Sequence, residues 1–179
     1  MTRLALLRHA DTAWSVEGRI QGRRDVPILE RAAIPVPEAC RGMRIVTSPL
    51  LRCVQTAALL GVPDAPREPR IAEMDWGEWE GERLADLRER LGDEMAQNEA
   101  RGLDFTPPGG ESPRMVLHRV RQWLLEVSVP TLAITHRGVI RVVLASATGW
   151  DMRGKPPVKL DWRAVHFFDV DERGAPRLP

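Results

Sequence analysis

Residues 4–12 have the sequence Leu-Ala-Leu-Leu-Arg-His-Ala-Asp-Thr, in which four apolar residues lead directly into a charged pair. The apolar run predicts a short buried strand, and a buried parallel strand delivers the residues after it to the crevice at its carboxyl end. Arg8 supplies a planar, permanently charged fork that suits a phosphate group, and the imidazole of His9 can act as nucleophile or proton carrier. The pair alone is weak evidence, because arginine is frequent here and His118-Arg119 and His136-Arg137 are also neighbours.

Length and composition predict one domain that spans residues 1–179 and needs no metal or disulfide for stability. Cys40 and Cys53 lack the spacing of a metal site and are too few for a disulfide framework, which favours a reducing, cytoplasmic location. No apolar run approaches the roughly 20 residues of a membrane span, so we expect neither a membrane segment nor an export signal. The net charge of +1 provides no global field for a nucleic acid, so a bound anion must meet a local cluster of charge.

Two more strand-to-helix transitions follow the first. Residues 44–47 predict a strand, and Ser48-Pro49 predicts the start of a helix over residues 50–60 that ends at Gly61 and holds Arg52 in its first turn. Residues 131–135 predict a strand that ends at His136, and Gly138 would separate this strand from an apolar helix that runs to residue 148.

The rest of the chain completes the alternation. Residues 13–27 predict an ordered loop at the mouth of the site, residues 28–43 leave room for at most one short helix, and residues 82–100 predict a helix interrupted at Gly92. Ser112-Pro113 repeats the capping signal before a helix with one apolar face, and residues 164–170 predict the last strand. This alternation predicts an α/β fold, a three-layer α/β/α sandwich around a mostly parallel sheet.

The three transitions carry related chemistry. In an open α/β sheet such positions converge on one crevice, even when they lie far apart in the sequence. Arg8, His9, Arg52 and His136 are therefore predicted to form one pocket that suits a phosphomonoester dianion.

Five segments carry a family resemblance: residues 7–12 (Leu-Arg-His-Ala-Asp-Thr), 47–57 (Thr-Ser-Pro-Leu-Leu-Arg-Cys-Val-Gln-Thr-Ala), 73–81 (Glu-Met-Asp-Trp-Gly-Glu-Trp-Glu-Gly), 107–112 (Pro-Pro-Gly-Gly-Glu-Ser) and 135–141 (Thr-His-Arg-Gly-Val-Ile-Arg). In this order they resemble the motifs of the histidine phosphatase superfamily, whose fold is phosphoglycerate mutase-like. The resemblance spans nearly the whole chain and says little about the substrate.

The resemblance implies a role for each matching residue. His9 would be the nucleophile that becomes phosphohistidine, and Glu73 would give a proton to the leaving group. The phosphoryl oxygens would be bound by Arg8, Ser15, Arg52, His136 and Arg137, with the backbone after His136 assisting. The rest of the substrate would be bound by Gln21 and Gly22. No metal or cofactor would be required.

Elementary chemistry agrees with two of these roles. Imidazole attacks only through an unprotonated nitrogen, and the charges of Arg8 and Arg52 disfavour imidazolium at His9. Glu73 must carry a proton to act as an acid, so we expect a partly desolvated carboxyl with Trp76 as its apolar neighbour.

The sequence departs from the family pattern in four places. Ala10 replaces the usual glycine after the nucleophile, which would be costly only if the backbone there required a positive φ. Arg137 stands where glycine is frequent, so its side chain can narrow or recharge the pocket, and Ser15 stands where asparagine is common. Residues 29–41 lack the usual long first helix.

Three functions remain open at this point. The first is a phosphomonoesterase that hydrolyses a small phosphorylated metabolite, such as α-ribazole phosphate or a sugar phosphate, through phosphohistidine. The second is a cofactor-dependent phosphoglycerate mutase, although the family's mutases have two adjacent arginines before the proline-rich turn and this chain has Arg101 alone. The third is a non-catalytic phosphate-binding regulatory module. We expect a small-molecule partner, neither nucleic acid nor membrane, and leave a homodimer open.

Other candidates have simpler interpretations. His118 is expected on a solvated helix face, and His166 is expected to be a strand histidine with its hydrogen bonds satisfied. Trp123, Trp150 and Trp162 are expected to serve packing.

Overall fold

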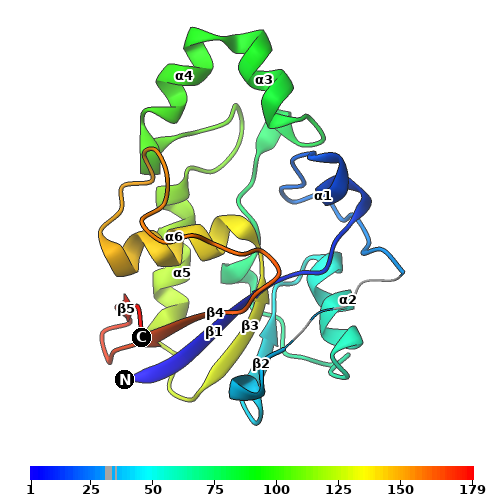
Figure 1. Cartoon of the computed structure of the whole chain (residues 1–179), viewed down its shortest axis with the longest axis vertical. Helices are drawn as coiled ribbons and strands as arrows, with labels where there is room; N and C mark the ends of the chain where they lie inside the picture. Colours follow the sequence, from blue (N-terminus) through cyan, green and yellow to red (C-terminus); the bar gives the residue numbers. More distant parts are fainter. Residues whose placement is uncertain (31–33, 35) are drawn as a thin grey trace.

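Five strands form the central sheet, in the order β2-β3-β1-β4-β5 (Figure 1). The computed structural model describes residues 1–30, 34 and 36–179. β3 lies between β1 and β2 and is parallel to both, whereas β4 and β5 extend the sheet antiparallel beyond β1. The bounds are Thr2–Arg8 for β1, Arg44–Thr47 for β2, Thr131–Thr135 for β3, His166–Val170 for β4 and Pro176–Arg177 for β5. The predicted strands are confirmed, although the last begins two residues later than predicted, at His166.

Alternate residues of β1 enter two separate cores, as the pleat of a strand requires. Leu4 and Leu6 pack with apolar side chains of α5 (Pro113–Leu124) and α6 (Arg137–Thr148). Ala5 and Leu7 pack on the other face with the apolar side of α2 (Leu51–Leu59). Helices thus cover both faces of a mixed, mostly parallel sheet, which confirms the predicted three-layer fold.

Helix starts agree with the sequence prediction only in part. Ser112 caps α5 as predicted, because its hydroxyl accepts a hydrogen bond from Met115 N. The predicted N-cap of α2, Ser48, is wrong by two residues, because Leu50 occupies the N-cap position. The hydroxyl of Ser48 instead lies 2.7 Å from Nε2 of His136. The prediction that Gly138 precedes α6 is also wrong, since α6 begins at Arg137.

The segment predicted as a loop over residues 13–27 contains the short helix α1 (Ala13–Glu17). Thr12 and Ser15 form a capping box that starts this helix, a pattern that the prediction missed. In the next segment Glu38–Cys40 forms the 3₁₀ turn η1. Residues 31–33 and 35 lie outside the described residues. The predictions of at most one short helix over residues 28–43 and of no long helix over residues 29–41 therefore lie partly outside them as well.

Helices α3 (Leu84–Leu91) and α4 (Asp93–Glu99) form the end of the molecule farthest from both termini (Figure 1). They meet at Gly92, whose φ of +51° favours glycine, so the predicted interruption is confirmed. Short 3₁₀ turns join the remaining elements: η2 (Pro69–Ile71), η3 (Gly77–Trp79) and η4 (Gly102–Asp104). Among the described residues, no helix combines the length and apolar character needed to cross a membrane.

Candidate active site

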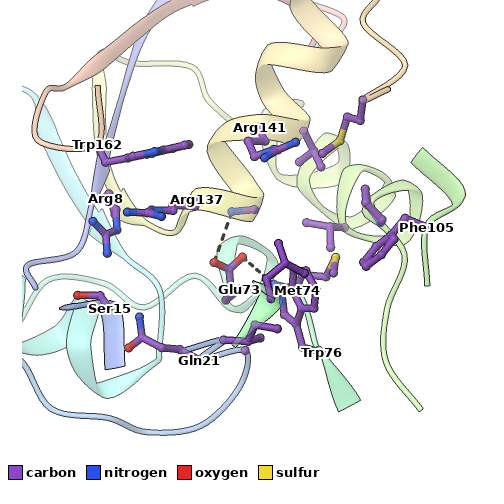
Figure 2. Close-up of a pocket in the computed structure, with 18 of the residues that line it drawn as sticks. Arg8, Ser15, Gln21, Glu73, Met74, Trp76, Phe105, Arg137, Arg141 and Trp162 are labelled. Carbon is purple, nitrogen blue, oxygen red and sulfur yellow. Dashed lines mark hydrogen bonds between the residues drawn. The ribbon is translucent and has the colours of Figure 1, made fainter. Parts of the chain in front are cut away.

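The three transitions meet at one edge of the sheet, because β1, β2 and β3 run in the same direction. Arg8 at the end of β1 is level with Thr135 at the end of β3, and Thr47 at the end of β2 pairs with Ile134. A pocket of about 570 Å³ opens at this edge (Figure 2). Seven of the sequence-predicted site residues line it: Arg8, His9, Ser15, Gln21, Gly22, Glu73 and Arg137.

His9 is held in a defined orientation at the inner end of the pocket. Its Nδ1 lies 2.7 Å from the carbonyl oxygen of Ala10, and we assign the ring hydrogen to Nδ1 because a carbonyl can only accept. The other nitrogen, Nε2, then carries the lone pair. Burial, followed by the charges of Arg52 and Arg8, holds the pKa of His9 well below its ordinary 6.5. The ring is therefore neutral and able to attack at neutral pH.

The turn after β1 is tied to the helix behind it. The backbone N–H of Ala10 donates to Oγ1 of Thr56 at 2.9 Å, and that hydroxyl donates to the carbonyl of Arg52 at 2.6 Å. Ala10 does not adopt a positive φ, so alanine costs no backbone strain here. Sequence analysis missed Thr56, although its position one helical turn after Arg52 was a usable signal.

Arg8 and Arg137 place positive charge near His9 in the pocket. Burial, together with the charge of Arg137, lowers the pKa of Arg8 to about 10, so Arg8 stays charged at neutral pH. Its Nη1 lies 3.4 Å from Oδ1 of Asp11, and its buried Nε has no hydrogen-bond partner among the described residues. These unmet donors suit an anionic ligand.

Arg52 and His136 are fully buried behind His9 rather than among the residues that line the pocket. Arg52 donates through its two Nη atoms to the carbonyls of Gly22 and Arg24, at 2.8 Å each. His136 lies 5.3 Å from His9 between ring centroids, and burial, followed by the charge of Arg52, holds its pKa well below 6.5. Direct phosphate contact by these two residues stays a prediction.

Glu73 points toward the start of α6, near Arg137 (Figure 2). One carboxylate oxygen accepts from Met74 N at 2.9 Å and the other from Gly138 N at 3.4 Å. A side chain on Gly138 would overlap Oε1 of Glu73, which explains why glycine occupies the first turn of α6. Trp76 lines the same pocket, and its role as the apolar neighbour of Glu73 stays a prediction.

The polar residues of the loop at the mouth serve mainly to order that loop. The hydroxyl of Ser15 accepts from Thr12 N at 3.0 Å and donates to Asp11 at 3.1 Å. Gln21 accepts from the hydroxyl of Thr12 at 2.7 Å. Gly22 contributes its carbonyl to Arg52, as described above. Substrate contacts by Ser15, Gln21 and Gly22 stay predictions.

Two tryptophans do more than the packing predicted for them. The guanidinium of Arg137 stacks on the ring of Trp162 at 4.9 Å from its centroid, and Trp162 also lines the pocket (Figure 2). Trp150 lies under the guanidinium of Arg141. Trp162 precedes β4, which pairs antiparallel with β1 and therefore begins at the edge of the sheet where β1 ends. This pairing brings Trp162 to the site, and the local sequence did not indicate it.

The predictions for His118 and His166 have different outcomes. His118 is exposed on α5, as predicted. The expectation of a fully satisfied His166 is wrong, because its buried Nε2 has no hydrogen-bond partner among the described residues. Within that same part of the chain, no three or more His, Cys, Asp or Glu side chains group to hold a metal ion.

Comparison with known proteins identifies the family. The model of the histidine phosphatase superfamily, branch 1, matches residues 4–177. The chain belongs to this superfamily. Among curated superfamily members, it is 27% identical to the 2,3-bisphosphoglycerate-dependent phosphoglycerate mutase of Beijerinckia indica, covering 88% of this chain and 86% of that protein. It is 30% identical to phosphoserine phosphatase 1 of Hydrogenobacter thermophilus, covering 85% and 79%.

Solved structures of the same fold agree. The mycobacterial glucosyl-3-phosphoglycerate phosphatase in complex with VO3 has a TM-score of 0.79 at 25% identity, covering 94% of this chain and 93% of that one. A Thermus thermophilus protein, TTHB049, has a TM-score of 0.73 at 28% identity, with 94% of each chain covered. The relatives of this chain within the histidine phosphatase superfamily thus include both mutases and phosphatases.

Proposed function

We propose that this histidine phosphatase superfamily member is a phosphomonoesterase that acts on a small molecule through a phosphohistidine at His9. The observation that carries the proposal is the orientation of His9. Its Nδ1–H is anchored on the carbonyl of Ala10, which leaves Nε2 with a lone pair at a pocket lined by Arg8 and Arg137. A neutral, oriented imidazole beside fixed cations is what attack on a phosphate ester requires.

The reaction would proceed in two displacements. In the first, the lone pair of His9 Nε2 forms a bond to phosphorus while the bond from phosphorus to the ester oxygen breaks, and the carboxyl of Glu73 gives its proton to the departing oxygen. In the second, the carboxylate of Glu73 takes a proton from a water molecule whose oxygen attacks phosphorus. The P–N bond then breaks, which releases inorganic phosphate and restores neutral His9.

The surrounding charges have separate tasks in this scheme. Arg8 and Arg137 would bind the non-bridging oxygens, because planar guanidinium forks match phosphate geometry and remain charged. Arg52, held by two carbonyls behind the ring, contributes its field to keeping His9 neutral. A bound phosphate dianion would also lie close to Glu73, and repulsion between the two negative charges favours the protonated acid that the first step needs.

The mutase relatives make phosphoglycerate transfer the second candidate. A mutase must hold a carboxylated substrate in two orientations and keep water from its phosphoenzyme, which requires additional fixed cations and a closed pocket. The pocket contains other arginines, but Arg101 is the single arginine ahead of the proline-rich turn and does not line the pocket, so the adjacent pair of arginines expected of a mutase has no counterpart there. We therefore favour hydrolysis.

The test is phosphate release by the purified protein from a panel of phosphomonoesters, with His9→Ala and, as matched control, the exposed His118→Ala. We expect turnover in the wild type and in His118→Ala, loss of it in His9→Ala, and an acid-labile, base-stable phosphoprotein in quenched wild-type reactions. Full activity in His9→Ala would overturn the proposal.

The same experiment includes 3-phosphoglycerate with catalytic 2,3-bisphosphoglycerate. Formation of 2-phosphoglycerate faster than inorganic phosphate would replace hydrolysis by the mutase reaction. Phosphate binding without either product would favour the regulatory module.

A further inference from the structure

The backbone that carries Glu73 has no regular secondary structure. Residues 73–76 lie between the turns η2 and η3 and belong to no helix or strand. Backbone polar groups outside a helix or a sheet ladder need hydrogen-bond partners from elsewhere. The place of the Glu73 carboxyl in the pocket therefore depends on the groups that hold this segment.

The side chain of Arg119, on α5, holds the segment through two backbone carbonyls. Its Nη2 donates to the carbonyl of Glu73 itself at 3.1 Å, and its Nη1 donates to the carbonyl of Arg70 at 2.6 Å. The side chain of Arg119 is only 17% exposed. Hydrogen bonds from a charged donor are roughly twice as strong as those from a neutral one, so Arg119 is a firm anchor for Glu73.

Glu111 fixes this guanidinium and binds the same segment. Its carboxylate accepts from Nε and Nη2 of Arg119, at 3.1 and 3.0 Å. Oε2 of Glu111 also accepts from Asp75 N at 3.0 Å and from Nη2 of Arg23 at 3.2 Å, and Glu111 N donates to the carbonyl of Asp75 at 2.8 Å. Burial raises the pKa of Glu111, but the hydrogen bonds from Arg119 and Asp75 outweigh burial and hold the pKa below its ordinary value. Glu111 is therefore a charged partner for Arg119 at neutral pH.

The other bonds near Glu73 are less able to set its position. Met74 N, which donates to the Glu73 carboxylate, belongs to the same segment and moves with it. The bond from Gly138 N is 3.4 Å long and therefore weak. Thr135 donates to the carbonyl of Ile71, two residues before the acid. Arg119 is the side chain that reaches the backbone of Glu73 itself.

We propose that Arg119 and Glu111 form a positioning pair that sets where the carboxyl of Glu73 lies in the pocket. The role of that carboxyl as an acid rests on the proposed function. Neither member of the pair lines the pocket, so the pair acts through the backbone of Glu73 and not by contact with the substrate. A displacement of a reacting group by about 1 Å can cost about a hundredfold in rate, so loss of this anchor should be measurable.

Steady-state kinetics of Arg119→Met on an alkyl phosphate and on p-nitrophenyl phosphate tests the pair. We expect kcat on the alkyl phosphate to fall about tenfold or more, because the acid is displaced. On p-nitrophenyl phosphate kcat should change by less than about twofold, because nitrophenolate departs without a proton. In a Glu73→Gln background the same substitution should add less than about twofold on either ester, because the group that Arg119 positions is already lost.

The backbone amide of Gly138 reports the place of the carboxyl without any turnover, because it donates to Oε2 of Glu73. Amide proton–nitrogen correlation NMR gives its chemical shift in the wild type, in Glu73→Ala and in Arg119→Met. We expect the shift in Arg119→Met to move from the wild-type value toward the Glu73→Ala value.

Arg114→Met is the matched control. Arg114 lies on the same helix and forms a two-bond ion pair with Asp104, at 2.6 and 2.9 Å, and neither residue lines the pocket. Its removal should leave both rates and the Gly138 shift at their wild-type values. Arg119→Lys keeps a charge for Glu111 but lacks the planar fork that reaches two carbonyls, so it should recover only part of the alkyl phosphatase rate.

The outcomes separate this inference from the proposed function. Equal losses on the two esters in Arg119→Met, an additive loss in the Glu73→Gln background, or a Gly138 shift that stays at the wild-type value would each overturn the positioning role. A wild type that releases no phosphate would overturn hydrolysis, and a displaced Gly138 shift would still support the positioning role. Circular dichroism checks that each variant folds, and Glu111→Gln, for which we expect the same effects, replaces Arg119→Met if the latter does not.

Discussion

Glu73 lines the same pocket as His9, and Arg8, Arg52, Arg137 and Arg141 lie within its electrostatic reach. If it protonates the leaving group, its removal should matter most for alcohols that leave poorly. Glu73→Gln should therefore slow hydrolysis of an alkyl phosphate by roughly 10²–10⁴ but affect p-nitrophenyl phosphate much less, because nitrophenolate departs without a proton. Steady-state kinetics on both esters measures this difference.

Glu78→Gln is the matched control for this residue. Glu78 is exposed in the same segment and does not line the pocket, so both esters should react at wild-type rates. Equal losses on the two esters in Glu73→Gln would instead assign Glu73 a structural role through its bonds to Met74 and Gly138.

At the scale of an element, contact with Glu73 rather than helix propensity determines which residue occupies position 138 in the first turn of α6. Alanine at Gly138 should stabilise an ordinary helix by about 1 kcal/mol. Here the added methyl group would overlap Glu73 Oε1, the movable end of a side chain. We expect Gly138→Ala to leave the free energy of unfolding close to the wild type, while displacement of Glu73 lowers kcat on alkyl phosphates at least about tenfold.

The Glu73→Ala background provides the comparison. With the carboxylate gone, Gly138→Ala has no neighbour to displace and should raise the free energy of unfolding by up to about 1 kcal/mol, measured by urea denaturation. A Gly138→Ala variant with full alkyl phosphatase activity would show that the position of Glu73 is not critical.

For the whole molecule, burial of two neutral histidines makes stability depend on pH. The folded pKa values of His9 and His136 lie well below 6.5, near which both titrate in the unfolded chain. Below about pH 6.5 the unfolded chain therefore binds protons that the folded protein does not. The free energy of unfolding falls as pH falls, by up to about 1.4 kcal/mol per pH unit for each histidine.

Urea denaturation between pH 7.5 and 5.5 measures this slope. His9→Asn should reduce it, and His118→Asn, which alters an exposed histidine, should leave it unchanged. A slope that is identical in the wild type and His9→Asn would contradict the neutral state of His9.

The sequence by itself determined the elements whose signals are local. The apolar run before Arg8 predicted β1, Ser112-Pro113 predicted the start of α5, and the order of five motifs indicated the family that the comparison then showed. The convergence of Arg8, His9 and His136 also followed, because parallel strands in one sheet end at the same edge.

Only the tertiary structure decided which side chains complete the site. Ser48 lies next to His136 instead of capping α2, and Trp162 reaches Arg137 because β4 pairs antiparallel with β1. Arg141 was visible within its motif, but the local sequence did not show that its buried Nε finds no hydrogen-bond partner in the part of the chain that the structure describes. Caps and strand patterns depend on a few neighbouring residues, whereas pairing, burial and unmet charge depend on segments far apart in the chain, and no local sequence signal encodes them.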